Sequence, residues 1–152
     1  MKRFFDFEAD FVNSLRCIPM QVRYNLDTCG IKLKLADWNH LNQEERQALV
    51  ELPCVTEQEV QAYRDYLRNL IFQRTGNYPS ELAIELHPAW MQANNIPESV
   101  EEKATEYGVN MTVSQWASLS PLERFALIKL SRLGHENKNF PKALEEFKLF
   151  NA

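Results

Sequence analysis

The chain has 152 residues, enough for one domain with a substantial hydrophobic core, and 45% of them are apolar, as in ordinary globular proteins. Its net charge of -4 gives no electrostatic reason to expect nucleic acid as a partner, and no apolar run reaches the roughly 18 residues of a membrane-spanning helix. Only 4 glycines argue against a sheet-rich protein with many tight turns, so we expect helices to dominate.

The first predicted element is a short arm or helix whose aromatic side chains pack onto the body of the protein. These side chains are Phe4, Phe5, Phe7 and Phe11. A helix follows that starts at Pro19, because proline suits a first turn, and ends at Gly30, because glycine readily takes the left-handed conformation that closes a helix. Alternating apolar residues predict a short extended segment over residues 31–35. The next helix begins after Asn42, which has the spacing of a capping box with Glu45.

The longest predicted helix covers residues 56–75. Thr56 and Glu59 have the spacing of a second capping box at its start, and Gly76 is placed to close it. An apolar stripe at helical spacing gives this helix one buried face. The stripe consists of Val60, Tyr63, Leu67, Leu70 and Ile71.

A connector follows over residues 77–97, which contain three prolines, and we expect one short helix in it around Leu82. Its Trp90 and Met91 are expected in the core. The last predicted helix covers residues 141–150 and presents apolar side chains on one face.

An internal repeat in the sequence predicts the architecture of the protein. Residues 19–52 align without gaps on residues 97–130, and ten of the 34 aligned positions are identical, among them Trp38 with Trp116. We therefore predict a mainly α protein, a single compact helical domain over residues 1–152 that is built on a duplication of helix, short extended segment and helix. The two extended segments are expected side by side about a pseudo-twofold axis, where a tiny two-stranded pairing between the copies can form.

No sequence motif for catalysis or phosphate binding is present, such as GxxxxGK[ST], GxSxG or HExxH. The three histidines (His40, His87 and His135) are far apart in sequence, and we expect surface or capping roles for them. The pairs Glu45–Arg46 and Glu123–Arg124 recur in both copies, which favours a structural role beneath the helix caps. We expect no catalytic residue and no cofactor, and therefore no enzyme.

The three cysteines show no paired spacing of the kind that zinc and iron–sulfur sites use. We interpret Cys17, Cys29 and Cys54 as reduced thiols and small buried hydrophobes, which indicates the cytoplasm, and we predict no metal site. Cys17 lies between Arg16 and the helix start at Pro19, surroundings in which a thiol can be reactive.

The run LRCIPM, followed by VRYNLD and CGIKL, is the most specific part of a pattern that continues in ELPCVTEQEVQAYRDYL and QWASLSPLERFALIKLSR. In these segments the chain resembles the nitrate reductase associated protein family of nitrate-assimilating photosynthetic bacteria, over nearly its whole length. The resemblance implies an accessory protein of assimilatory nitrate reductase, an enzyme with a molybdopterin cofactor and an iron–sulfur cluster. It implies a role in maturation, cofactor insertion or stability through protein–protein contact, and it supplies no site residues.

The partner-binding surface is predicted where the first copy departs from the second. Met20 aligns with Glu98 and Arg23 with Glu101, so the first copy carries a basic and apolar stretch that the second lacks. We expect this stretch to dock on the reductase apoprotein or on an anionic pterin; a local structural corner is the alternative. The predicted residues are Arg16, Cys17, Ile18, Pro19, Met20, Arg23, Lys32 and Lys34.

Two other functions stay open from the sequence. One is a metal or cluster carrier that uses Cys17, Cys29 and Cys54. The other is a general helical adaptor unrelated to nitrate. Neither the oligomeric state nor the assisted step follows from the sequence.

Overall fold

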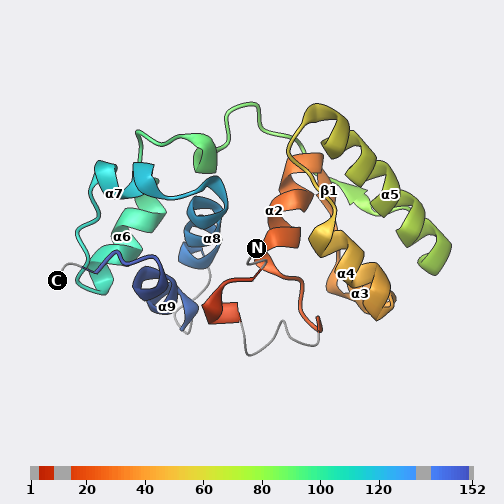
Figure 1. The fold of residues 1–152 in the computed structure, drawn as a ribbon, viewed down its shortest axis with the longest axis horizontal. Coiled ribbons are helices and arrows are strands. Elements are labelled where there is room, and N and C mark those ends of the chain that lie inside the picture. Colours follow the sequence, from red (N-terminus) through yellow and green to blue (C-terminus); the bar gives the residue numbers. More distant parts are fainter. Residues whose placement is uncertain (1–3, 9–14, 133–137, 151–152) are drawn as a thin grey trace. The chain divides into compact units, whose positions relative to one another are not determined.

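The protein is mainly helical in a computed structural model that describes residues 4–8, 15–132 and 138–150 (Figure 1). Across these residues there are eight α-helices, two 3-10 helices and one two-stranded sheet. The predicted mainly α class is therefore confirmed. The chain divides into two compact units, residues 1–84 and 85–152, and the grouping of both into one domain stays a prediction.

The first unit is built around helix α2, which packs against α4 and α5. Trp38, Leu49 and Leu67 are completely buried in its core, beside the apolar face of α2. The elements of this unit, in chain order, are η1 (Asp6–Glu8), α2 (Met20–Cys29), β1 (Ile31–Lys32), α3 (Leu35–Asn39), α4 (Gln43–Glu51), α5 (Glu57–Thr75) and β2 (Ser80–Glu81).

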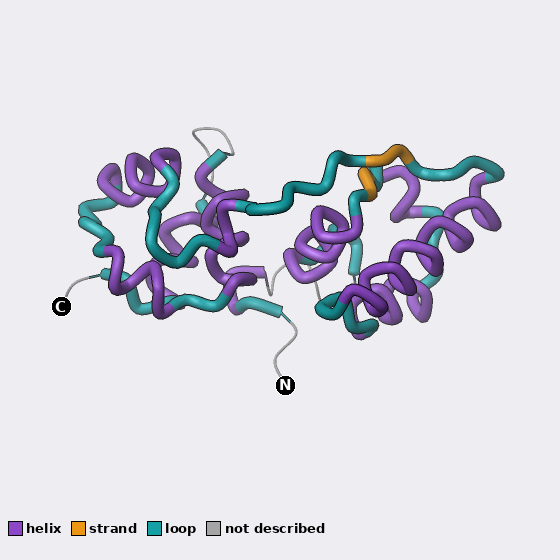
Figure 2. Tube along the Cα trace, turned by 90° about the horizontal axis from the view of Figure 1, so that it is seen from above, coloured by secondary structure: helices purple, strands orange, loops and turns teal. Residues whose placement is uncertain are grey.

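The small sheet lies wholly within the first unit, where β1 pairs antiparallel with β2 in the register Ile31 opposite Glu81 (Figure 2). Two predictions are therefore wrong: the short helix around Leu82, and the pairing of strands between the two sequence copies. After α5 the chain turns back along the edge of β1, and the Leu82 amide donates to the Gly30 carbonyl at 2.8 Å. That carbonyl group and the neighbouring strand hold the segment extended, so it cannot form a helix. Residues 109–112, the counterpart in the second copy, form no strand.

The second unit is arranged around α8, whose side chains are buried on nearly every side because α6, α9 and η2 all pack against it. Its buried residues are Arg124, Phe125, Ala126, Leu127, Ile128 and Leu130. The elements of this unit are η2 (Ala89–Met91), α6 (Glu98–Glu106), α7 (Val113–Ser118), α8 (Pro121–Ser131) and α9 (Asn139–Glu146).

Two details of the second unit differ from the prediction. The last helix ends at Glu146 instead of residue 150, since Lys148 has a φ of 58° and so interrupts helical backbone. Trp90 is half-buried and meets the Phe125 ring edge-on at 5.0 Å, but Met91 is 55% exposed and does not belong to the core. In a 3-10 turn of three residues, only one of two adjacent side chains can face the same neighbour.

Helix ends follow the sequence closely. The three predicted capping boxes, at Asn42, Thr56 and Ser120, are all formed, and Gly30 and Gly76 close their helices in the left-handed conformation. A fourth box starts α7 at Thr112, with Gln115 as the reciprocal partner. The sequence analysis missed it because the alternation of apolar residues predicted an extended segment through Val113, where this helix begins.

The aligned copies place their helices at matching positions. Helices α2, α3 and α4 begin at residues 20, 35 and 43, and α6, α7 and α8 begin at residues 98, 113 and 121, which are 78 residues further along. Trp38 and Trp116, the aligned tryptophans, are both completely buried, as expected. The duplication as an event in the history of the chain stays a prediction.

The contacts of Arg46 explain why the Glu–Arg pair recurs, beginning with the first copy. Its guanidinium donates to the carbonyls of Leu15, Trp38 and Asn39 at 3.2–3.3 Å. The indole N–H of Trp38 donates to the same Leu15 carbonyl at 2.8 Å. Together these side chains tie the segment before α2 to the α3–α4 corner, which is a structural role.

Arg124 has the same role in the second copy. It donates to the carbonyls of Trp90 and Leu119 at 2.7 and 2.8 Å, and the Trp116 indole donates to the Gln92 carbonyl at 2.8 Å. The segment before α6 is thereby fastened to the α7–α8 corner. Because both arginines donate hydrogen bonds to backbone carbonyls, the Glu–Arg pairs have a structural role, as the repeat suggested.

The two left-handed glycines of the first unit give a test of packing around the sheet. A Cβ added at Gly30 (φ 76°) would lie 2.7 Å from Ile84 Cγ1, whereas one added at Gly76 (φ 81°) would meet nothing within 4 Å. Gly76→Ala should cost about 1 kcal/mol of unfolding free energy, the backbone penalty alone, and Gly30→Ala about 2 kcal/mol more, because the β2 segment must also move. Urea unfolding followed by circular dichroism measures both; equal losses would contradict the close packing of Ile84 on Gly30.

Candidate partner-binding surface

The segment before α2 is anchored by a buried carboxylate. Glu8 is 1% exposed, and its two oxygens accept hydrogen bonds from the Met20 amide at 2.8 Å and the Phe5 amide at 3.2 Å. Pro19 occupies the N-cap position and has no side chain that can cap α2, so Glu8 supplies the acceptor that the helix start needs. Sequence reasoning missed this residue because the contact joins positions twelve residues apart.

The aromatic arm packs as expected. Phe7 is buried, and its ring stacks on Phe5 at a centroid distance of 5.1 Å. Phe4 is partly buried against the core of the first unit. Phe11 lies outside the described residues.

The predicted partner-binding residues divide into two groups. Ile18, Pro19 and Met20 are buried, so they belong to the core rather than to an accessible surface. Arg16 and Arg23 are exposed. The exposed and half-buried residues close to each other are therefore Arg16, Cys17 and Arg23, the last of which donates from Nε to the Ile18 carbonyl at 3.1 Å.

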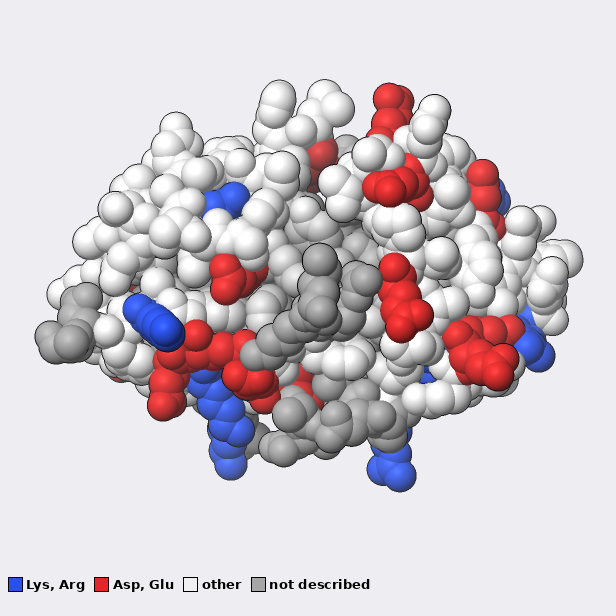
Figure 3. Space-filling view, in the orientation of Figure 1, with Lys and Arg blue, Asp and Glu red and all other residues white. Residues whose placement is uncertain are grey.

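Lys32 and Lys34 are exposed but follow the opposite end of α2. The ten residues of that helix span about 15 Å, which separates the two lysines from Arg16. On the face shown in Figure 3, the described Lys and Arg side chains stand in separate small groups, and Asp and Glu are more numerous. The eight predicted residues thus do not form one continuous basic and apolar patch.

Cys29 and Cys54 are buried thiols, as predicted, and Cys17 is half-buried. Burial raises the pKa of Cys29 to about 11 and that of Cys54 to about 12, which keeps both in the neutral form that binds metal poorly. Across the described residues, no three His, Cys, Asp or Glu side chains are grouped as metal ligands. His40 and His87 lie on the surface, and His135 is outside the described residues.

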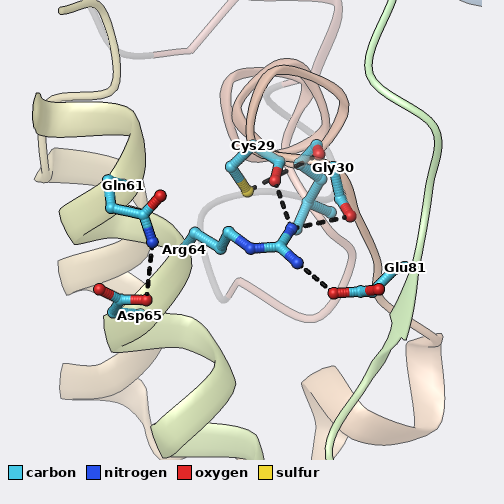
Figure 4. A network of polar contacts seen from close by, with 7 residues as sticks. Cys29, Gly30, Gln61, Arg64, Asp65 and Glu81 are labelled. Carbon is cyan, nitrogen blue, oxygen red and sulfur yellow. Dashed lines mark hydrogen bonds and ion pairs between the residues drawn. The ribbon is translucent and has the colours of Figure 1, made fainter. Parts of the chain in front are cut away.

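Arg64 joins three elements of the first unit: its side chain reaches from α5 to the end of α2 and to β2 (Figure 4). Its guanidinium donates to the carbonyls of Cys29 and Gly30 at 2.7 and 3.2 Å and forms an ion pair with Glu81 on β2. The C-terminal carbonyls of α2, which carry the negative end of the helix dipole, are thereby paired with a cation. Arg64 is consequently a structural residue, because its guanidinium is engaged by the two carbonyls and by Glu81.

Arg68 lies one turn further along α5 and differs from Arg64. Its guanidinium stacks over the Tyr78 ring at 4.7 Å from the centroid, and its Nε is buried without a hydrogen-bond partner. No carboxylate of the described residues forms an ion pair with it. Tyr78 also stacks on Phe72 at 4.6 Å, and these two rings are 53% and 45% exposed. Such a surface, aromatic and cationic, can bind a carboxylate together with an apolar side chain.

The second unit has an open depression at the start of α6, and its surroundings are acidic. The depression is lined by Asn95, Ile96, Pro97, Glu98, Glu101, Glu102 and Thr105. Glutamates in a first helical turn stabilise the positive end of the helix dipole, which accounts for their position there.

A protein-family model described as conserved nitrate reductase-associated protein matches residues 4–147. No curated protein and no solved structure matches the chain. None of the described helices combines the length and the apolar sequence that crossing a membrane requires.

Thiol reactivity should separate the three cysteines. At pH 8 a thiol reagent such as iodoacetamide should modify Cys17 within minutes and leave Cys29 and Cys54 intact, because both are buried and protonated. Mass spectrometry of the digested protein identifies the modified residues, and the urea-unfolded chain, in which all three should react, is the control.

The same thiols should make the fold sensitive to alkali. Their pKa is higher in the folded protein than the ordinary value of 9.0, so folding favours the protonated form, and this contribution is complete below pH 9 and lost as the pH rises towards 11–12. A Cys29→Ala variant should therefore lose less stability than the wild type between pH 9 and pH 11, measured by urea unfolding. Equal losses would show that the Cys29 thiol does not contribute.

Arg64 and Arg68 should differ in what they contribute to stability. Arg64→Gln removes charged hydrogen bonds to two carbonyls and an ion pair, and should cost about 2 kcal/mol of unfolding free energy. Arg68→Gln removes one aromatic contact and no hydrogen bond, and should cost less than about 1 kcal/mol. Urea unfolding of the two variants beside the wild type measures the difference, and an equal or larger loss for Arg68→Gln would contradict these roles.

Proposed function

Because the chain belongs to the family of conserved nitrate reductase-associated proteins, whose model matches residues 4–147, we propose that it is an accessory protein of assimilatory nitrate reductase. In this proposal it is not an enzyme. It assists maturation, cofactor insertion or stability of the reductase through protein–protein contact. The observation that carries the proposal is the family match, which extends over nearly the whole chain.

The chemistry of the buried groups supports a role without catalysis. Arg46 and Arg124 are bonded to backbone carbonyls, and Glu8 is bonded to backbone amides. The buried Tyr63 hydroxyl donates to the Leu49 carbonyl at 2.7 Å, and burial holds its pKa above the ordinary range. Each of these groups stabilises the fold, so none is poised to transfer a proton or to attack a substrate.

A cytoplasmic location is part of the proposal. Cys17, Cys29 and Cys54 are all free thiols, as is usual in a reducing compartment. The same thiols speak against the alternative of a cluster carrier, since the high pKa of Cys29 and Cys54 disfavours the thiolates that a cluster needs.

Direct contact with the reductase is the expected outcome of a pull-down. The tagged protein should retain nitrate reductase prepared without its molybdopterin cofactor, the mature enzyme, or both, and retention of the cofactor-free form alone would place the contact before cofactor insertion. The measurement is the amount of reductase retained on the resin at physiological salt. An unrelated control protein of similar size and net charge accounts for non-specific binding.

Cells that lack this protein give an independent readout. They should show less nitrate reductase activity for the same amount of reductase polypeptide, with activity restored by the returned gene. Retention of neither form of the reductase, together with unchanged activity in such cells, would refute the proposed function and favour an adaptor unrelated to nitrate.

A further inference from the structure

We propose that Arg68, Phe72 and Tyr78 form the docking surface for the partner, and that this surface binds a carboxylate side chain of a protein segment with an apolar side chain beside it. This aromatic–arginine surface lies on α5 and on the segment that leads to β2. The inference rests on the proposed function, because it names the place where the reductase would be contacted.

The first argument is that the charge of Arg68 is not compensated. Along the same helix, Arg64 is paired with Glu81, and Arg74 is paired with Glu45 at 2.6 Å. Within the described part of the chain, Arg68 has neither an ion pair nor a hydrogen bond. Acidic side chains outnumber basic ones by four in this chain, and yet the half-buried guanidinium of Arg68 has no carboxylate partner among the described residues.

The second argument is that the guanidinium of Arg68 is already ordered before a partner binds. Its Cζ atom lies 4.7 Å from the centroid of the Tyr78 ring, a contact that restricts the movement of the guanidinium, and only Nε is among the buried side-chain atoms without a partner. The terminal nitrogens therefore remain accessible. An arginine that is already ordered loses little conformational freedom when a carboxylate forms two parallel hydrogen bonds with it.

The third argument concerns the exposed rings. Phe72 and Tyr78 are stacked, and about half of each side chain is open to solvent. Aromatic residues and arginine are the side chains most enriched at the energetic centres of protein interfaces. A free phosphate or another small anion would neutralise Arg68 but would leave both rings uncovered, whereas a protein segment can supply the anion and the apolar cover together.

The neighbouring contacts restrict what can bind. Asp65, on the adjacent turn, accepts a hydrogen bond from Gln61 at 3.0 Å (Figure 4), and it is in none of the ion pairs of the described residues. Its charge also disfavours a second carboxylate on that side. We therefore expect a single acidic residue at the centre of the partner segment and an apolar residue beside it that packs over Phe72.

Charge reversal at matched positions tests this surface. In the pull-down, Arg68→Glu should weaken binding to the reductase by about tenfold or more, since it replaces attraction by repulsion at an interface centre. Arg16→Glu makes the same charge change at the exposed end of the sequence-predicted patch and should leave the affinity within about twofold. Arg68→Gln, which removes the charge without reversing it, is the second variant in case charge reversal disturbs folding, and circular dichroism verifies the fold of each protein.

The outcomes are distinct. If the wild type binds and Arg68→Glu and Arg68→Gln bind equally well, the docking surface is wrong and the proposed function stands. If only Arg16→Glu loses binding, the N-terminal patch is the docking site instead. If the wild type binds neither form of the reductase, both proposals fail. A dimer of the wild type that Arg68→Glu converts to a monomer would assign the surface to a second copy and overturn the inference.

Zero-length cross-linking identifies the partner carboxylate. In an Arg68→Lys variant, carbodiimide should join the amine at position 68 to an Asp or Glu of the reductase, with loss of water, and mass spectrometry locates the two residues. An Arg16→Lys variant, treated in the same way, is the matched control. A reductase cross-link at position 16 and none at position 68 would overturn the inference.

Discussion

The fold depends on pairing the backbone carbonyls that short helices leave open. Several helices of this protein have only five to eleven residues, so a large share of their C-terminal carbonyls has no partner inside the helix. Arginine meets this need at three places. Arg46 and Arg124 bind the corners between successive helices in the two units, and Arg64 binds the end of α2. A planar donor with five N–H groups can serve several carbonyls at once, which lysine cannot do in the same geometry.

This use of arginine makes Arg68 the informative exception. Like Arg64, it is an arginine on α5. Its guanidinium, however, donates no hydrogen bond to a carbonyl and pairs with no carboxylate of the described residues. The contrast could not be found in the sequence, where the two arginines are four residues apart and look equivalent. Their difference arises from the segment after α5, in which Glu81 on β2 pairs with Arg64 and the preceding Tyr78 ring stacks on Arg68.

The sequence predicted what is decided locally. Capping boxes at Asn42, Thr56 and Ser120, and the closing glycines, depend on residues within one turn of each helix end, so their spacing was sufficient. The extended path of residues 80–82 depends on the edge of a strand fifty residues earlier, and no local pattern contains that information.

The docking site predicted from the sequence was likewise limited by contacts between residues that are far apart in the chain. A difference between aligned copies located a stretch with special residues, but Ile18, Pro19 and Met20 turned out to be buried, and Glu8 explains why the corner is built as it is. Divergence between two copies can reflect a local structural need as well as a partner. Only burial and contacts separate the two explanations at these positions.

The hydrogen bond between Glu8 and the start of α2 also affects how the protein responds to proteases. Glu8, in the arm formed by residues 4–8, supplies the acceptor for the first amide of α2, and Phe7 of the same arm is buried and stacks on Phe5. A protease that trims residues 4–8 would remove the buried Phe7 and the carboxylate on which α2 begins, while it leaves every α-helix of the first unit uncut. Release of this arm would then give proteases a route to the protein that does not require the α-helices to unfold first.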